Sequence, residues 1–165
     1  MGGAAALAAA AALSALPSAP PAFADDEKVL CDAACAEGLD KLETVTTESG
    51  LKYKDIVVGK GAIPPTGYQV VVHYVAMTPA GRVFFNSLSS RPLDIRVGSG
   101  QVVAGLDEGL QTMKPGGIRR LYIPGDMAFP KGLKAAAGRP TVPPNSPVMF
   151  DVQLLYIPGL EDDEE

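Results

Sequence analysis

Two long stretches of alternating apolar residues constrain the fold of this chain more than any other feature. In residues 68–77 and again in residues 148–157, apolar side chains recur at every second position over about ten residues. Side chains on an extended strand point alternately to opposite faces, so this spacing is typical of β-strands. In the first stretch, one face carries Val70, Val72 and Tyr74. The other face carries Val71, His73 and Val75.

The rest of the chain supplies shorter strands and one helix. Strands are predicted at residues 51–58, 82–85, 93–97 and 118–123, separated by turns and loops rich in Gly and Pro. Residues 102–113 carry an apolar stripe at helical spacing, and the Lys-Pro-Gly-Gly that follows is typical of a helix end. The sum predicts an α+β fold, a curved antiparallel sheet of five or six strands wrapped around one short helix.

Four regions are expected along the 165 residues. Residues 1–24 are apolar, contain an Ala/Leu run, and end in Ala-Phe-Ala, the pattern of a targeting segment that is cleaved. This apolar run is too short, and too interrupted by proline, for a transmembrane helix. We therefore expect no membrane span in the mature form. Residues 25–48 form a polar extension with a short predicted helix and two cysteines, residues 49–158 the main domain, and residues 159–165 an acidic tail.

Charge and cysteine content narrow the function classes. The net charge of −5 argues against a nucleic-acid partner, because phosphate binding needs clustered Lys and Arg. Cys31 and Cys35 are too few for a structural zinc site. In an oxidising compartment they suggest a disulfide, but their spacing fits poorly on a straight helix. Free thiols and a bridge to another chain therefore stay open beside the disulfide.

Several segments carry recognisable motifs: residues 71–74 (VVHY), 81–84 (GRVF), 97–98 with 101–109 (QVVAGLDEG), 113–117 with 120–124 (RLYIP), 142–146 (VPPNS) and 150–152 (FDV). In this order and with this spacing, they resemble the FKBP family of peptidyl-prolyl cis-trans isomerases. The similarity covers about 105 residues, which is the length of a typical single domain. The early cysteines and the N-terminal segment narrow it to FKBP-like proteins of the plant and algal thylakoid lumen.

The resemblance implies an FKBP-like half-barrel with an apolar pocket that isomerises X-Pro bonds without cofactor or metal. The Val103 N–H would hold a substrate carbonyl. Three positions depart from the family: Phe85 replaces an Asp, Phe129 replaces a Tyr, and Leu106 replaces a frequent Trp, although Leu is an accepted variant. The residues implied to line the pocket are Tyr74, Phe84, Phe85, Val102, Val103, Leu106, Phe129, Val142 and Phe150.

The resemblance also sets the expected partners and compartment. We expect a prolyl isomerase with attenuated activity that acts on X-Pro segments of client proteins in the thylakoid lumen. A bacterial exported or periplasmic protein is the competing location. The alternative function is a non-catalytic FKBP-like chaperone, an assembly factor, or a structural subunit of a thylakoid photosynthetic complex, which the joint departures at Phe85 and Phe129 favour.

Overall fold

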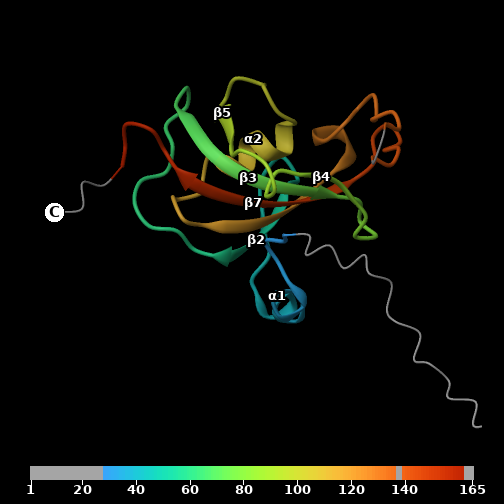
Figure 1. The fold of residues 1–165 in the computed structure, drawn as a ribbon, viewed down its shortest axis with the longest axis horizontal. Helices are drawn as coiled ribbons and strands as arrows, with labels where there is room; N and C mark the ends of the chain where they lie inside the picture. The colour runs from blue at the N-terminus through green and yellow to red at the C-terminus, as the bar shows by residue number, and fades with distance from the viewer. Residues whose placement is uncertain (1–27, 137–138, 162–165) are drawn as a thin grey trace, which may run out of the picture.

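The computed structural model describes residues 28–136 and 139–161 (Figure 1). The predicted targeting segment at residues 1–24 and most of the acidic tail lie outside these ranges. Within them, no helix has both the length and the apolar character that a membrane crossing requires.

A single antiparallel sheet forms most of the structure and confirms the predicted α+β class. Its strands run in the order β1-β2-β6-β7-β3-β4, and β5 pairs with β3 beside β4. The central position of β7 follows from its long pairings with β3 and β6. The strands are β1 (Val45–Thr46), β2 (Lys52–Val57), β3 (Gln69–Met77), β4 (Val83–Asn86), β5 (Leu93–Arg96), β6 (Ile118–Ile123) and β7 (Val148–Tyr156).

The sheet has seven strands rather than five or six, because β1 forms in the polar extension, where no strand was predicted. Val45 pairs with Tyr53 across a tight reversal of the chain. Within the reversal, the Thr47 N–H donates to the Leu51 carbonyl at 2.8 Å, and Gly50 has a φ of +94°. Glycine adopts this left-handed conformation without steric cost, so the short pairing becomes possible.

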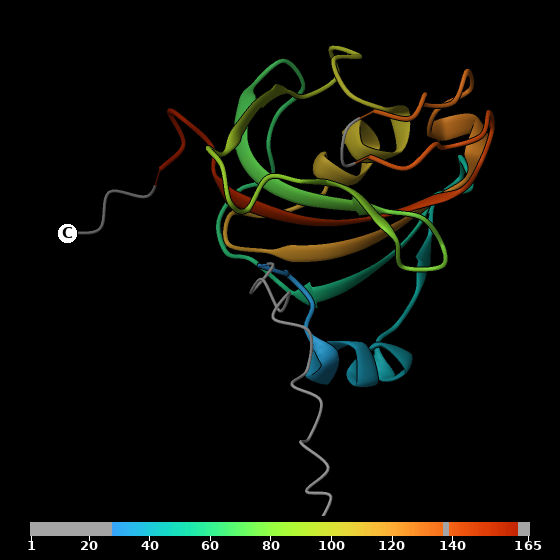
Figure 2. The ribbon, with the colours of Figure 1, turned by 45° about the vertical axis from the view of Figure 1, so that its right-hand side comes forward.

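The helix α2 (Ala104–Leu110) lies against the concave face of the sheet (Figure 2) and is shorter than predicted at both ends. Val103 is the N-cap residue with an extended ψ of 145°, so Val102 and Val103 precede the helix. Beyond Leu110 the chain leaves the helix in a turn in which the Met113 N–H donates to the Leu110 carbonyl. The apolar stripe still enters the core. The spacing of the apolar residues therefore predicted correctly which side chains are buried, but it predicted a longer helix than the structure has.

Two glycines let α2 approach the sheet closely. A methyl group at Gly105 would collide with Ile123, and one at Gly109 would lie 2.6 Å from Cδ2 of Leu121. Leu121 and Ile123 project from β6 and are almost fully buried, so neither can move away easily. The backbone of α2 therefore packs directly on β6 side chains, which fixes the height of the helix above the sheet.

Replacing Gly109 by alanine is expected to destabilise the protein by about 1–3 kcal/mol, because overpacking outweighs the better helix propensity of alanine. Urea denaturation measures the change. Gly38→Ala is the matched control, since nothing lies within 4 Å of the added methyl group. An unchanged or raised midpoint for Gly109→Ala would show that the helix can shift.

The N-terminal extension lies on the face of the sheet opposite α2 (Figure 2). It contains α1 (Ala33–Gly38) and the short 3-10 helix η1 (Leu39–Lys41). Asp32 caps α1 by accepting a hydrogen bond from the Cys35 N–H at 2.8 Å. A disulfide joins Cys31 to Cys35 with a Cα–Cα distance of 5.2 Å. The geometric difficulty disappears because the helix begins only after Asp32, so Cys31 is not helical.

The extension is anchored at both ends of one row of side chains that crosses the sheet. The residues of this row are successive cross-strand partners on β4, β3, β7, β6 and β2: Asn86, Val75, Asp151, Arg120 and Lys54. At one end the Asn86 side chain donates to the Lys28 carbonyl at 3.0 Å, and at the other Lys54 donates to the Leu39 carbonyl at 2.8 Å. Between them Asp151 is only 2% exposed and forms an ion pair with Arg120 at 2.7 Å. The extension thus spans a buried ion pair.

Candidate functional site

Five aromatic rings form one connected wall on the concave side of the molecule, which we call the aromatic bowl. Tyr74 stacks on Phe85 and on Phe150, with ring centroids 4.6 Å and 5.3 Å apart. Phe84 meets Phe129 and Phe150 edge to face at 5.9 Å and 6.4 Å. Such offset and edge-to-face contacts each add stability beyond simple burial. The rings therefore hold one another in place without a ligand.

Separate elements bring these rings together. Tyr74 lies on β3, Phe84 and Phe85 on β4, and Phe150 on β7, whereas Phe129 follows the short 3-10 helix η2 (Gly125–Met127). β3 pairs with both β4 and β7, with Ala76 opposite Phe85 on one side and Phe150 on the other. The sheet register thus sets the positions of four of the rings, and only Phe129 depends on a loop.

The bowl contains two neighbouring cavities that share Tyr74, Phe129 and Phe150. The first, which we call the loop cavity, has a volume of about 170 Å³. The second, the helix cavity, has a volume of about 240 Å³. Besides the shared rings, the loop cavity is lined by Ala76, Phe84, Phe85, Leu133 and Arg139, and the helix cavity by Gln101, Val102, Val103 and Leu106.

The walls of the bowl are largely dry. Phe150 and Phe84 are 2% and 7% exposed, whereas Phe85 is 39% exposed and forms part of the rim. Burial raises the pKa of the Tyr74 hydroxyl above its ordinary value of 10.0, so the hydroxyl stays neutral at physiological pH. A group bound between these rings would exchange water for an apolar, mostly uncharged surface.

The segment that enters α2 is fixed by a carboxylate of the helix itself. Asp107 accepts a hydrogen bond from the Gly98 N–H at 2.7 Å and a longer one from the Gly100 N–H at 3.4 Å. Both glycines have positive φ, so the chain turns sharply before Val102 and Val103. Among the described residues, the hydrogen bonds at this turn use the carbonyl of Val103 and not its N–H. The N–H is therefore free to serve a bound carbonyl group.

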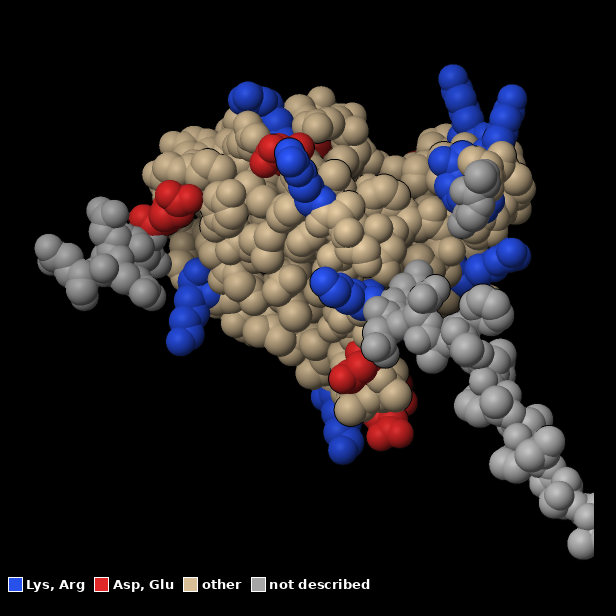
Figure 3. Space-filling view, viewed as in Figure 1, with Lys and Arg blue, Asp and Glu red and all other residues tan. Residues whose placement is uncertain are grey.

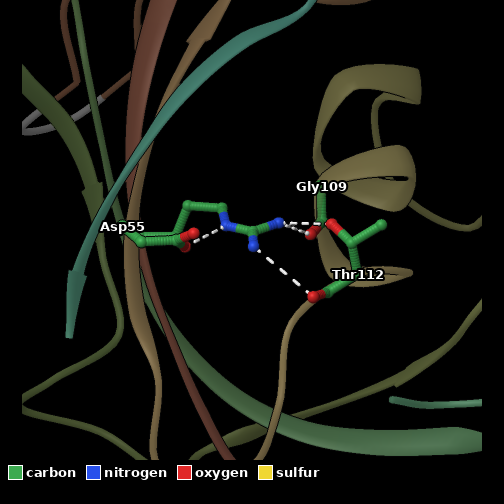
Figure 4. Close-up of polar contacts among 4 residues, drawn as sticks. Asp55, Gly109 and Thr112 are labelled. Carbon is green, nitrogen blue, oxygen red and sulfur yellow. Dashed lines mark hydrogen bonds and ion pairs between the residues drawn. The ribbon is translucent and has the colours of Figure 1, made fainter. Parts of the chain in front are cut away.

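Arg119 of β6 holds the far end of α2 (Figure 4). Its guanidinium donates to the Gly109 carbonyl at 3.0 Å, to Thr112, and to the Asp55 carboxylate at 2.6 Å. The same group lies 3.9 Å above the ring of Tyr53, a cation–π arrangement. Because α2 carries Leu106 into the floor of the helix cavity, Arg119 acts on the bowl through the placement of the helix.

Eight of the nine residues that the sequence implied for the pocket line the two cavities. The exception is Val142, which lines neither cavity. Its side chain is 2% exposed within the core, and its backbone pairs with Leu133. Val142 belongs to the same buried cluster as Phe84 and Phe150, and its role in the pocket stays a prediction.

The structure also adds lining residues that the sequence argument missed. Ala76 lies two positions after Tyr74 on the same face of β3, so strict alternation would have found it. Gln101 directly precedes Val102 and could have been inferred from it. Leu133 and Arg139 come from the loop at residues 131–140, where no periodic pattern predicts which side chains turn toward the rings.

The lining residues suit desolvation better than acid–base or metal chemistry. The described residues around both cavities include no His, Cys, Ser or carboxylate. Over the described part of the chain, no three His, Cys, Asp or Glu side chains gather in a way that could hold a metal ion. What the bowl offers is a dry aromatic surface, one backbone donor at its floor, and one guanidinium at its edge.

Comparison with known proteins gives a consistent family. Residues 60–155 match the family described as FKBP-type peptidyl-prolyl cis-trans isomerase. The chain is 59% identical over 142 residues to the Arabidopsis thaliana "Peptidyl-prolyl cis-trans isomerase FKBP16-3, chloroplastic", with 86% of this chain and 64% of that protein covered. It is 41% identical over 111 residues to "FK506-binding protein 4" of Dictyostelium discoideum, with 67% of this chain and 29% of that protein covered.

Solved structures agree with the sequence relatives. The crystal structure of AtFKBP13 superposes with a TM-score of 0.63 at 34% identity, with 70% of this chain and 98% of that chain covered. The two relatives are longer, since the chain spans 64% and 29% of their lengths.

Proposed function

The chain belongs to the FKBP family of peptidyl-prolyl cis-trans isomerases, and on that premise we propose that its aromatic bowl catalyses the isomerisation of X-Pro bonds in client proteins. The observation that carries this proposal is the wall of five touching rings above the floor formed by Leu106. A proline ring is apolar and compact, and a cavity of about 240 Å³ beside three of the rings suits it.

The geometry supports catalysis by solvent exclusion. Rotation about an X-Pro bond crosses a barrier of roughly 18–20 kcal/mol, because the twisted state loses amide resonance. Water bonded to the amide favours the planar, charge-separated ground state. Transfer into the dry bowl removes that water, and the Val103 N–H holds a carbonyl of the client while the bond turns. The reaction then needs neither a nucleophile nor a proton transfer.

Two rings replace polar groups of the family and support attenuated activity. Phe85 stacks on Tyr74 where the family has a carboxylate, and Phe129 meets Phe84 where the family has a tyrosine hydroxyl. Each missing hydrogen bond costs about 0.5–1.5 kcal/mol of transition-state stabilisation. Turnover slowed by about ten- to a hundredfold is therefore expected, with desolvation intact.

The same two replacements favour a second candidate, a non-catalytic FKBP-like chaperone, assembly factor or complex subunit. The bowl would then hold proline-containing segments without turning them over. The two candidates differ in one measurable property, the exchange rate between cis and trans client peptide. Migration with a large thylakoid membrane complex would favour the subunit, whereas migration as a small soluble protein would favour the enzyme.

We assign the protein to the chloroplast and propose, more narrowly, that it lies in the thylakoid lumen. The chloroplastic relative at 59% identity supports the first statement. The apolar residues 1–24, expected to be a cleaved targeting segment, support the second. Residues 25–48 and 49–158 would then form the mature extension and the isomerase domain. Protease protection of the protein inside isolated thylakoids would test the lumenal location.

The deciding experiment measures cis–trans exchange in an uncharged X-Pro peptide by exchange NMR, with the full chain as catalyst. We expect a rate above the uncatalysed one that varies little between about pH 6 and about pH 9. The lining residues include no His or carboxylate, and burial raises the pKa of Tyr74 from 10.0. No rate above background at high protein concentration would leave only the non-catalytic candidate, and a bell-shaped pH profile would point to an acid–base group outside the bowl.

A further inference from the structure

We propose that Arg139 makes the bowl selective for X-Pro segments with an acidic residue next to the proline. This inference rests on the proposed function, because it names the client chemistry of the same site. Among the described residues that line the two cavities, Arg139 is the one that carries a charge. It lies in the loop cavity with Phe85, the residue that stands in place of the family's carboxylate. The charge at this wall of the bowl is thus positive rather than negative.

The backbone around Arg139 holds its side chain at the cavity. Arg139 and Ala136 exchange two backbone hydrogen bonds, of 2.9 Å and 3.2 Å, and form an isolated bridge. Nη2 of Arg139 donates to the Lys134 carbonyl at 2.6 Å. Deeper in the loop, Leu133 and Val142 pair in the same way, which closes a small lobe beside the rings. The guanidinium is therefore placed by the lobe rather than free to extend into solvent.

The guanidinium also has unused hydrogen-bonding capacity. Its Nε is buried and donates to no acceptor among the described residues. A buried donor of a charged group without a partner costs free energy that an incoming acceptor recovers. A carboxylate fits this need because it can accept two parallel bonds from the planar fork of an arginine. A neutral amide or an amine cannot do the same.

The local charge points to the same class of client. Residues 128–145 contain Lys131, Lys134 and Arg139 and no acidic residue, although the whole chain carries −5. Figure 3 shows Lys and Arg side chains gathered over this loop at the upper right of the molecule. Such a positive lobe at the mouth of a cavity attracts acidic segments and raises their local concentration.

The two cavities divide the roles within one client. The helix cavity, with Leu106 and the Val103 N–H, takes the proline and a neighbouring carbonyl. The loop cavity shares Tyr74, Phe129 and Phe150 with it, so it receives the residue adjacent to the proline. An acidic side chain at that adjacent position reaches Arg139 and gains a charge-assisted pair that a neutral side chain lacks.

The test compares short peptides with Glu, Gln or Lys directly before the proline, and a second set with the same residues directly after it. Binding to the full chain is followed by NMR titration, and turnover by exchange NMR on the same samples. For one of the two positions, the Glu peptide is expected to bind about tenfold more tightly than the Gln peptide, the usual scale for a hydrogen bond to a charged group. The Lys peptide is expected to bind more weakly than the Gln peptide.

Three variants separate a specific contact from general charge. Arg139→Gln should bring the Glu-to-Gln binding ratio within about twofold, and Arg139→Glu should reverse the order of the Glu and Lys peptides. Lys134→Gln is the matched control, since it removes the same charge from the same loop but no lining side chain of either cavity, and it should keep most of the ratio. Unchanged circular dichroism and thermal midpoints would show that all three variants fold.

The possible results distinguish a failure of the proposed selectivity from a failure of the proposed catalysis. Equal binding of Glu and Gln peptides in both sets would overturn the inference, as would an equal loss of the ratio in Arg139→Gln and Lys134→Gln. Binding ratios that hold while no peptide is isomerised would support the selectivity and count against the catalytic proposal. Turnover of all peptides at equal efficiency and affinity would do the opposite.

Discussion

Replacing Asp151 by alanine is expected to destabilise the folded protein by about 3–5 kcal/mol, the usual cost of leaving one partner of a buried ion pair alone. Both side chains are enclosed, at 3% exposure for Asp151 and 12% for Arg120. The carboxylate accepts two hydrogen bonds from the guanidinium, at 2.7 Å and 2.8 Å. The hydrogen bond to Asp151 is also the main reason that the pKa of Arg120 is raised above its ordinary value, so the arginine would stay charged and buried without a partner.

Equilibrium urea denaturation measures this loss, and a double variant provides the control. Asp151→Leu combined with Arg120→Met removes both charges and fills a similar volume, so it should recover most of the stability. A single variant that loses less than about 1 kcal/mol would show that water reaches Arg120 from the N-terminal side. In that case the extension that spans the pair would not seal it.

Restoring the two polar groups of the family should raise isomerase activity by about ten- to a hundredfold. The change is the double variant Phe85→Asp and Phe129→Tyr, and kcat/KM for an uncharged X-Pro peptide is the measured quantity. Each new polar group adds a hydrogen bond in the transition state worth about 0.5–1.5 kcal/mol. The two sites touch different rings, Tyr74 for Phe85 and Phe84 for Phe129, so the gains should be roughly additive.

The new carboxylate would share the loop cavity with Arg139, so the design needs a second background. In Arg139→Gln the aspartate at position 85 is free of the guanidinium, and the gain from Phe129→Tyr should appear in both backgrounds. Loss of the preference for Glu peptides in Phe85→Asp would show that the new charge neutralises the old one. If neither single variant nor the double variant gains activity, the slow turnover has a cause other than the missing polar groups.

The sequence predicted the sheet because its information is local and periodic. Alternation in residues 68–77 and 148–157 located β3 and β7, and these two strands carry Tyr74 and Phe150. The helix ends were less accurate, since apolar spacing reports burial and continues through Val102 and Met113, where the backbone is no longer helical. Strand β1 was missed because two residues are too few for any periodic signal.

The part of the loop cavity that is formed by residues 131–140 could not be predicted, for a different reason. Whether Arg139 faces the rings depends on the pairing of Ala136 with Arg139 and of Leu133 with Val142, which couples residues through space. Composition gave only a Gly- and Pro-containing stretch with three positive charges. The same loop contains Val142, which is buried and lines neither cavity, and Arg139, which lines the loop cavity although no sequence pattern predicted it.

The order of the strands has a consequence for how the protein is made. β7, the last strand of the described sheet in chain order, lies in the middle of that sheet between β3 and β6. Until it arrives, the facing edges of β3 and β6 have no partner, and the ring of Phe150 is missing from the bowl. Unpaired edges of this kind invite pairing with other chains. The sheet therefore cannot close from its N-terminal strands alone, and it stays incomplete until residues 148–156 have been synthesised.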